Sequence, residues 1–250
     1  MELSDRMKFY EQCFDPVLPL KIPLVIRVDG KAFHTLTRGL KVFDEQFSGF
    51  MTKTMLELCT EIQGCVLGYT QSDEISLLLR DDQTPNTEAW MGKRLNKITS
   101  ISAAIATDEF NKAASDFLLT RTRVARFDSR AFVLPKEDVC NYFIWRQLDA
   151  TRNSVFGYCL EKLGNKVGIG IAMNMLHGKS IDEQQEILFQ ETGLNWSNIE
   201  VWKKRGIAAV KVEKEITTDD GLIVKRNKFE LDYDMPILTQ DREYIEKVLV

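Results

Sequence analysis

The sequence predicts an α+β fold of the ferredoxin-like type, in which a split βαβ unit forms an antiparallel sheet, followed by a smaller C-terminal α/β appendage. Two observations support this prediction. Strand and helix patterns follow one another in the order β-α-β-β-α-β, and a further helix comes next. Near the C-terminal end, two more strand patterns flank a turn signal. We assign residues 1–165 to the first domain and residues 166–250 to the C-terminal extension.

Three strands and one helix are predicted in the first third of the chain. Residues 22–28, IPLVIRV, are apolar and largely β-branched, which predicts a mostly buried strand. Residues 43–62 carry apolar side chains at helical spacing and are followed by Gly64, a stop signal. Two strand patterns separated by a short turn then predict a hairpin, over residues 65–70 and 74–80.

Two helices and a fourth strand complete the unit. Apolar residues recur on one face of residues 87–117, which predicts a long helix. Residues 130–134 predict a strand closed by Pro135, and residues 136–163 predict a helix that ends at Gly164. In a split βαβ sheet the first strand lies between the third and the fourth and runs antiparallel to the third.

The remainder of the chain predicts the appendage. Ser180 and Glu183 have the spacing of a capping box that opens a helix. Strand patterns over residues 207–216 and 222–231 flank the turn signal TTDDG, which predicts a second hairpin. Residues 239–249 predict a short terminal helix.

Composition is that of an ordinary globular protein, with 44% hydrophobic and 28% charged residues. No apolar run reaches the length of a membrane span, and the polar start does not predict a signal peptide, so we expect a cytoplasmic protein without a membrane partner. The five cysteines lack metal-binding spacing, and there are two histidines. A disulfide framework and a zinc site are therefore disfavoured, and any metal is expected to be a hard ion, Mg²⁺ or Mn²⁺.

The net charge of −4 is unlike that of a typical nucleic-acid-binding domain, which is basic. Local basic clusters are present nevertheless. They are RTRVAR, KKR and KRNK, at residues 121–126, 203–205 and 225–228. Each cluster taken alone is typical of a solvated surface.

Acidic residues stand where two neighbouring strands are predicted to end. Asp29 follows the first strand, and Asp73 and Glu74 occupy the turn of the hairpin. Because the predicted topology brings these positions to one edge of the sheet, they are suited to holding two divalent ions about 3.5–4 Å apart for displacement at phosphorus. Gly30 leaves room for a phosphate or a metal, and the KAFHTL segment after it offers main-chain N–H groups to a triphosphate.

Each half of this pattern also has a structural interpretation. An Asp-Gly after a strand and a Ser-Asp-Glu in a hairpin are both common turns. Their convergence on one predicted edge favours catalysis, and that convergence depends on the predicted topology.

RVDGKAFH, at residues 27–34, combined with GYTQSDEIS, at residues 68–76, resembles the tRNA-His guanylyltransferase superfamily of 3′–5′ nucleotide-adding polymerases. The resemblance extends to SRAFVLP and WRQLDATRN, and so covers at least residues 22–157. It implies a polymerase-like palm, which agrees with the split βαβ arrangement.

The resemblance implies a role for each matching residue. Asp29, Asp73 and Glu74 would form the catalytic acidic site. Asp29 and Asp73 would ligate two Mg²⁺ ions, with the Gly30 carbonyl as a further ligand. The other matching positions would bind the nucleotide and its triphosphate: Lys31, Ala32, Phe33, His34, Lys41, Asp44, Ser72, Arg94, Lys97 and Arg130.

Several of these residues also have structural interpretations. From the sequence alone, His34 is more typical of a satisfied core or loop histidine, and Asp44 is also typical of a helix N-cap. Arg94 and Lys97 are one helical turn apart, as on a solvated helix face. Three tryptophans are expected in the core rather than as base-stacking platforms, namely Trp145, Trp196 and Trp202.

One segment departs from the eukaryotic-type members of the family. Thr151 stands where those members carry a histidine. This change is similar to the bacterial and archaeal like-protein branch, which implies templated repair of 5′-truncated tRNA rather than one obligatory guanylate on tRNA-His. The resemblance also implies ATP and GTP as substrates, activation of the 5′-phosphate by either nucleotide, and a homotetramer whose subunits share the tRNA contacts.

Two other functions stay open at this point. A nucleotide cyclase or dinucleotide synthase with a palm would use the same acidic residues without RNA. A non-catalytic RNA-binding module would use them only as turn residues.

Overall fold

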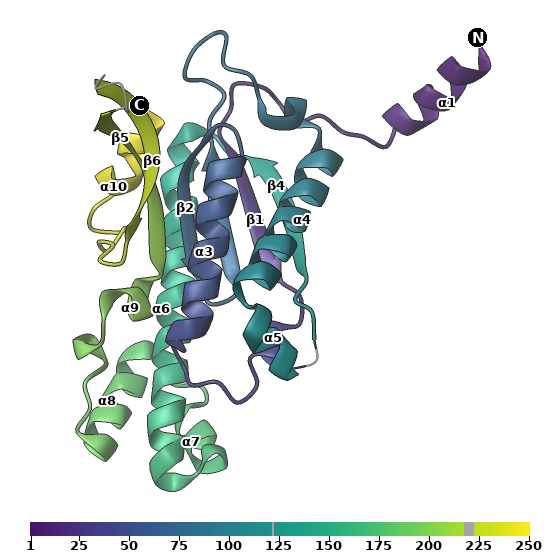
Figure 1. Cartoon of the computed structure of the whole chain (residues 1–250). Helices are drawn as coiled ribbons and strands as arrows, with labels where there is room; N and C mark the ends of the chain where they lie inside the picture. Colours follow the sequence, from purple (N-terminus) through teal and green to yellow (C-terminus); the bar gives the residue numbers. More distant parts are fainter. Residues whose placement is uncertain (122, 218–222) are drawn as a thin grey trace.

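The central sheet has six strands in the order β4-β1-β3-β2-β5-β6, and every neighbouring pair is antiparallel (Figure 1). The computed structural model describes residues 1–121, 123–217 and 223–250. The first strand lies between the third and the fourth, so the predicted split βαβ arrangement is confirmed. The strands are β1 (Leu24–Gly30), β2 (Cys65–Gln71), β3 (Glu74–Leu79), β4 (Phe127–Val133), β5 (Ile207–Thr217) and β6 (Ile223–Asp232).

Helices cover both faces of the sheet, with α3 and α4 in front of it in Figure 1 and α6 behind it. Among the described residues, no helix combines the length and the apolar character that crossing a bilayer requires. The helices are α1 (Leu3–Gln12), α2 (Phe33–Leu36), α3 (Glu45–Glu61), α4 (Leu95–Ala113), α5 (Ser115–Arg121), α6 (Lys136–Val167), α7 (Ile169–Leu176), α8 (Ile181–Thr192), α9 (Val201–Arg205) and α10 (Glu243–Glu246), with 3₁₀ turns η1 (Trp90–Lys93), η2 (Trp196–Asn198) and η3 (Lys247–Leu249).

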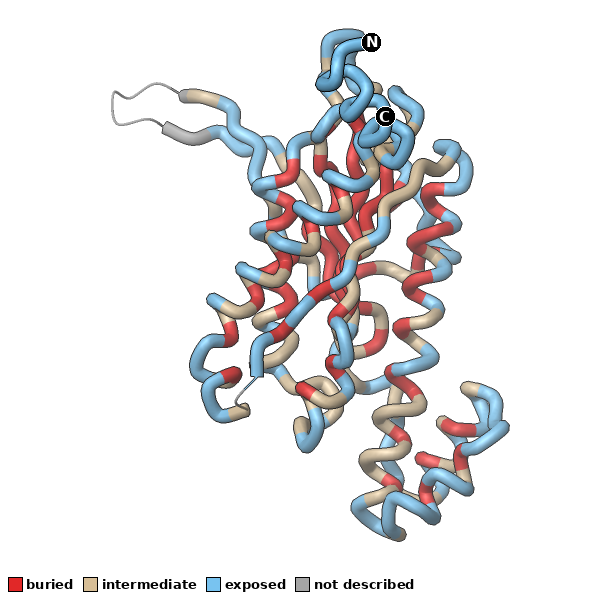
Figure 2. The backbone as a smooth tube through the Cα atoms, turned by 90° about the vertical axis from the view of Figure 1, so that its right-hand side faces the viewer, coloured by how far each residue is buried: buried red, intermediate tan, exposed pale blue. Residues whose placement is uncertain are grey.

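The two faces of β1 belong to different apolar clusters. Ile26 packs with Leu58 of α3 in one cluster, and Val25 packs with Phe143 of α6 in the other. Figure 2 shows the buried residues concentrated in the strands and in the helix faces turned toward them. Because side chains alternate along a strand, Asp29 lies on the same face as Val25, the face that α6 covers.

The helix predicted over residues 87–117 is divided into η1, α4 and α5. Met91, Gly92 and Lys93 adopt positive φ values, which an α-helix excludes. The buried ammonium of Lys93 donates to two carbonyls of the segment before β1 and to the Asp81 carboxylate. These tertiary partners, which a buried charge requires, override the helical pattern at this point.

The C-terminal region continues the same sheet, because β5 pairs with β2 and β6 pairs with β5. Helices α7 and α8 pack on the second half of α6, and the predicted capping box of Ser180 and Glu183 is formed. The short terminal helix is present as α10 and η3. The predicted turn TTDDG lies, except for its first residue, outside the described residues. The predicted domain boundary after residue 165 falls within α6 and stays a prediction.

Helix α1 was not expected from the sequence. It lies away from the body of the protein in Figure 1, and none of its residues is buried. The chain returns to the body at the isolated bridge between Val17 and Arg94.

Candidate active site

The acidic residues predicted to meet at one edge of the sheet do so. Asp29 pairs in register with Glu74. The backbone N–H of Gly30 donates to the carbonyl of Asp73 at 3.0 Å. Asp73 stands in the tight turn that joins β2 to β3, next to Ser72, whose φ is +51°. The end of β1 and the hairpin turn therefore form one acidic edge.

The two predicted metal ligands are electrostatically coupled. Burial raises the pKa of Asp29 above its ordinary value, and the neighbouring carboxylate of Asp128 raises it further. Burial also raises the pKa of Asp73, and the charge of Asp29 adds to that rise. A bound cation would offset the repulsion between these two partly buried carboxylates.

The donor set fits Mg²⁺ because it consists of oxygen atoms only. Across the described ranges, no three acidic, histidine or cysteine side chains are grouped so as to hold a metal by themselves. Magnesium usually binds through one or two carboxylates and completes its shell with water and substrate phosphates. Asp29 and Asp73 supply that number of carboxylates.

Gly30 is needed for a different reason from the one predicted. A Cβ at this position would lie 2.5 Å from the ring of Phe33, so the space is filled by an aromatic side chain rather than left for a ligand. Phe33 is buried and packs against three other rings, those of Phe47, Phe110 and Phe127. The side chain of Phe33 is therefore not available to a nucleotide, and only its main chain could contact one.

Glu74 is bound by a residue that the sequence did not single out. Arg146 of α6 donates through Nε and Nη2 to both carboxylate oxygens of Glu74, and through Nη2 to Asp149 at 3.0 Å. The WRQLD motif contains Arg146, but nothing local in that motif shows which side chain it meets. Arg146 therefore anchors Glu74, and with it the acidic edge, to α6.

Arg130, which is predicted to bind the nucleotide, lies within β4 beside the acidic edge. In the antiparallel pairing of β4 with β1, Arg130 lies opposite Arg27 and Asp128 lies opposite Asp29. The charges of Arg27 and Arg130 both lower the pKa of Asp29 against the dominant effect of burial. Asp128 was missed because the strand was predicted to begin at residue 130, whereas β4 begins three residues earlier.

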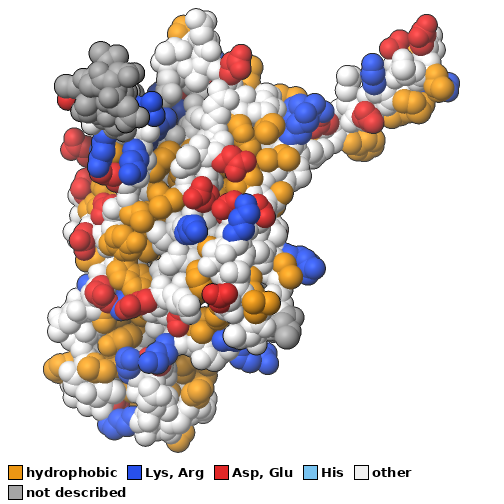
Figure 3. All heavy atoms as spheres, viewed as in Figure 1, with side chains coloured by type: hydrophobic (Ala, Val, Ile, Leu, Met, Phe, Trp, Pro, Cys, Tyr) orange, Lys and Arg blue, Asp and Glu red, His pale blue; other side chains and the backbone are white. Residues whose placement is uncertain are grey.

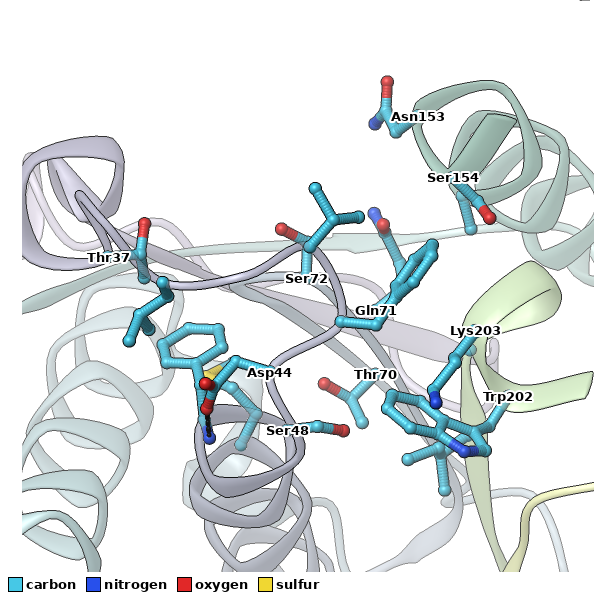
Figure 4. Close-up of a pocket in the computed structure, with 18 of the residues that line it drawn as sticks. Thr37, Asp44, Ser48, Thr70, Gln71, Ser72, Asn153, Ser154, Trp202 and Lys203 are labelled. Carbon is cyan, nitrogen blue, oxygen red and sulfur yellow. Dashed lines mark hydrogen bonds between the residues drawn. The ribbon is translucent and has the colours of Figure 1, made fainter. Parts of the chain in front are cut away.

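A pocket of about 340 Å³ lies beside the hairpin turn (Figure 4). Three predicted nucleotide-binding residues line it, Lys41, Asp44 and Ser72. Figure 4 shows the opposite side formed by residues from α6 and α9, which the sequence did not assign to a site: Asn153, Ser154, Trp202 and Lys203.

The loop before α3 forms one wall of this pocket. Asp44 is the N-cap of α3, since its Oδ1 accepts from the backbone N–H of Phe47 at 2.9 Å. The N–H of Val42 donates to Glu161 of α6 at 2.7 Å, and the ring of Phe43 stacks on Tyr158 with centroids 6.3 Å apart. The loop is thus held against α6.

Family models match nearly the whole chain. The model described as tRNAHis guanylyltransferase matches residues 4–135, and the model of the C-terminal domain of that family matches residues 137–244.

The chain belongs to the tRNAHis guanylyltransferase family.

Solved structures and curated relatives agree with this assignment. A bacterial tRNA(His) guanylyltransferase (Thg1)-like protein in complex with ATP is 35% identical, with a TM-score of 0.84 over 99% of both chains. A complex of such a protein with GTP is 34% identical, with a TM-score of 0.78 over 99% of this chain and 98% of the other. The probable tRNA(His) guanylyltransferase of Drosophila melanogaster is 30% identical over 206 residues, which are 80% of this chain and 70% of that protein.

The predicted family, palm fold and enzyme class are therefore confirmed, and this member of the tRNAHis guanylyltransferase family is a nucleotidyltransferase. In the segment that departs from eukaryotic-type members, the hydroxyl of Thr151 donates to the carbonyl of Lys204 at 3.1 Å. Thr151 thus joins α6 to α9, the helix that carries Trp202.

The remaining family motif residues after Gly30 lie at the same edge. Lys31 is exposed, and its N–H donates to the carbonyl of Arg126 at 2.8 Å. Ala32 adopts a left-handed conformation with φ of 56° and precedes α2. His34 is exposed, and its charge is among those that lower the pKa of Asp73.

Arg94 and Lys97 are not brought to the acidic edge of the same chain. Thr107 of α4 accepts from the N–H of Phe127, which pairs with Gly30. Arg94 precedes Thr107 by 13 residues, about 20 Å along a helix at 1.5 Å per residue. Arg94 instead forms an ion pair with Asp15.

The prediction that the tryptophans lie in the core is wrong for Trp145, which is 52% exposed beside the cation of Arg146. Trp202 lines the pocket, and the indole N–H of Trp196 donates to Ser154 at 3.1 Å. Trp196 and Trp202 are partly buried and pack against apolar clusters of the core.

Proposed function

We propose that this protein adds nucleotides in the 3′–5′ direction to the 5′ end of tRNA, in a template-dependent way, to repair truncated 5′ ends or to add a guanylate to tRNA-His. The observation that carries the proposal is the meeting of Asp29 and Asp73 at one strand edge, beside a nucleotide-sized pocket, in a member of the tRNAHis guanylyltransferase family. The similar structures in complex with ATP and GTP support these nucleotides as substrates.

The proposed reaction has two displacements at phosphorus. The 5′-monophosphate of the tRNA attacks the α-phosphorus of ATP or GTP, and pyrophosphate leaves. The 3′-hydroxyl of the incoming nucleoside triphosphate then attacks the activated 5′-phosphorus, and the nucleoside monophosphate leaves. Removal of pyrophosphate from the new end can follow. The protein contributes mainly positioning and stabilisation of charge.

Asp29, Asp73 and the Gly30 carbonyl are proposed to hold two Mg²⁺ ions, and the all-oxygen donor set supports this choice. When bound, the ions neutralise triphosphate charge and polarise phosphoryl oxygen. The chain itself places Arg130 and the exposed Lys31 next to the same edge, where their charges can hold phosphates in position.

The pocket is proposed to hold the base of a nucleotide. Its walls include the aromatic rings of Phe43, Phe47 and Trp202, and its rim carries polar groups such as Asp44 and Asn153. Apolar walls with a few polar groups are typical of ligand pockets, and an indole is a suitable platform for base stacking.

We further propose a homotetramer in the cytoplasm whose subunits share the tRNA contacts. One copy has a net charge of −4, so its positive charge is only locally concentrated. The position of Arg94 and Lys97, far along α4 from the acidic edge, suits contact with a substrate held by another subunit.

A 5′-labelled, truncated tRNA offered with Mg²⁺ and each nucleoside triphosphate in turn tests the proposed function. Asp29→Ala and Asp73→Ala should each reduce addition by about 10²–10³-fold or more while the circular dichroism spectrum is retained. Asp182→Ala, which removes an exposed acid of α8, is the matched control and should keep full activity. Full turnover by either folded active-site variant would contradict the assignment.

The same assay distinguishes the two alternatives. A cyclic product from GTP and Mg²⁺ without RNA would identify a cyclase or dinucleotide synthase. Unchanged tRNA affinity in EDTA, combined with no turnover of any nucleotide, would identify an RNA-binding module.

A further inference from the structure

Two segments that are free of acidic residues lie against each other at the acidic edge. Residues 30–43 and 117–127 contain six of the 33 lysines and arginines of the chain and none of its 37 aspartates and glutamates. The six are Lys31, Arg38, Lys41, Arg121, Arg123 and Arg126. In a chain with a net charge of −4, this separation of sign creates a strongly positive region.

Direct contacts join the two segments into one surface. The N–H of Lys31 donates to the carbonyl of Arg126 at 2.8 Å. The guanidinium of Arg121, at the end of α5, donates to the carbonyl of Arg38 at 2.6 Å. Figure 3 shows lysine and arginine side chains at the lower end of α5. We call Lys31, Arg38, Arg121, Arg123 and Arg126 the basic surface.

The backbone between two of these arginines is anchored to α4. The side chain of Asn111, on α4, accepts from the N–H of Ala125 and donates to its carbonyl, both at 3.0 Å. Ala125 is buried, and Arg123 and Arg126 on either side of it are exposed. Because two hydrogen bonds tie Ala125 to α4, Arg123 and Arg126 project from an anchored stretch of backbone.

Four of the five cations of this surface are not neutralised by a carboxylate of the described residues. Within the part of the chain that the structure describes, Lys31, Arg38, Arg123 and Arg126 form no ion pair with a carboxylate. Exposed cations elsewhere do form such pairs, for example Lys112 with Asp108. Unpaired, exposed cations hold counterions that a polyanion displaces on binding.

We propose that the basic surface binds backbone phosphates of the tRNA next to its reacting 5′ end. Lys31 directly follows Gly30, so the surface begins at the acidic edge. A polyanion with regularly spaced phosphates matches several neighbouring cations better than a single phosphate does. This inference rests on the proposed function and adds the location of the RNA contact.

Direct binding tests the inference without requiring turnover. The affinity for a fluorescein-labelled, 5′-truncated tRNA is measured by anisotropy, without nucleoside triphosphates, over a range of KCl concentrations. The variant Arg38→Gln/Arg123→Gln removes two unpaired cations of the surface. The matched control, Lys8→Gln/Lys53→Gln, removes two exposed cations, one on α1 and one on α3, that form no ion pair with any described residue.

We expect the surface variant to bind the tRNA about tenfold more weakly than the control at about 150 mM KCl, and its log–log salt slope to be smaller by about 1.5–2. Equal affinities and equal slopes for the two variants would overturn the inference. So would an unchanged tRNA affinity together with loss of binding to phosphatidylserine vesicles, which would assign the surface to membranes.

Binding and catalysis can fail separately. If tRNA binding is salt-sensitive and depends on the basic surface, but the protein adds no nucleotide, the proposed function is overturned. The inference that the basic surface binds tRNA is then retained. Nucleotide addition by a protein whose tRNA affinity does not depend on Arg38 and Arg123 would support the proposed function and overturn the inference about the basic surface.

Discussion

Arg146 and Glu74 form a bidentate ion pair between α6 and the sheet, with Nε and Nη2 of the arginine 2.7 and 2.6 Å from the two carboxylate oxygens. Their side chains are only 6% and 7% exposed. Glu74 immediately follows Asp73, so this pair anchors the turn that carries a proposed metal ligand. Arg146 therefore acts as a positioning residue, because it reaches the acidic edge through another side chain.

Replacement of Arg146 by methionine should lower the free energy of unfolding by about 3–5 kcal/mol, because the charge of Glu74 would be left buried without its cationic partner. Urea denaturation followed by circular dichroism measures this change. Replacing both residues, Arg146→Met with Glu74→Leu, should recover much of the loss. Lys112→Met, at an exposed ion pair, should change nothing measurable. An unchanged urea midpoint for Arg146→Met would exclude the anchoring role.

Asp82 should stabilise the fold in a pH-dependent way. Hydrogen bonds from Arg80 and Lys136 lower the pKa of Asp82 to about 2 from an ordinary value of 3.8. Since the folded-state pKa is the lower one, the stabilisation is complete above pH 3.8 and is lost as the pH falls through about 2. Asp82→Asn should therefore cost about 1–2 kcal/mol at pH 7. Urea midpoints of the two proteins should converge as the pH falls from 3.8 to about 2, and a constant gap would refute the prediction.

Glu161 should preserve the affinity of the pocket for the incoming nucleotide. Its carboxylate accepts from the N–H of Val42 and so holds the loop that carries Asp44. Loss of one charge-assisted hydrogen bond costs about 1.5 kcal/mol or more, so Glu161→Ala should raise KM for GTP about tenfold and leave kcat nearly unchanged. Steady-state kinetics of addition measure both constants. Glu186→Ala, an exposed position on α8, is the control, and equal KM values for the two variants would disprove the role.

Gly206 should be indispensable for the packing of α9 against the sheet. Its φ is +82°, and a Cβ would lie 2.6 Å from the carbonyl oxygen of Thr70 and 2.8 Å from the ring of Tyr69. Gly39 has a similar φ of +83°, but a Cβ there would meet nothing within 4 Å.

The pair Gly206→Ala and Gly39→Ala thus separates steric overlap from backbone strain. Gly39→Ala should cost about 1 kcal/mol, the strain of a left-handed alanine, and Gly206→Ala about 2 kcal/mol more, because backbone atoms must move. Thermal and urea unfolding measure the difference. Equal losses of stability for the two variants would show that the backbone at Thr70 moves away from a Cβ at position 206 without cost, and would contradict the prediction.

Local patterns were sufficient for the strand order of the palm and for the place where the acids meet. Short apolar runs bounded by turn signals identify β1, β2 and β3, and the split βαβ order then brings Asp29 beside Glu74. The long helix before β4 was predicted without its breaks, because Lys93 obtains its partners from the segment before β1 and from Asp81.

Sequence by itself therefore determined the family, the palm topology and the acidic residues of the proposed metal site, since these depend on motifs and periodicities within short segments. Only the tertiary structure decided that Arg146 takes both oxygens of Glu74, that Trp202 and Lys203 line the pocket, and that Arg94 stays far from Asp29. The physical reason is that these contacts connect segments about 70 to 160 residues apart in the chain. Their distances are set by how side chains pack, and no local periodicity in the sequence encodes that packing.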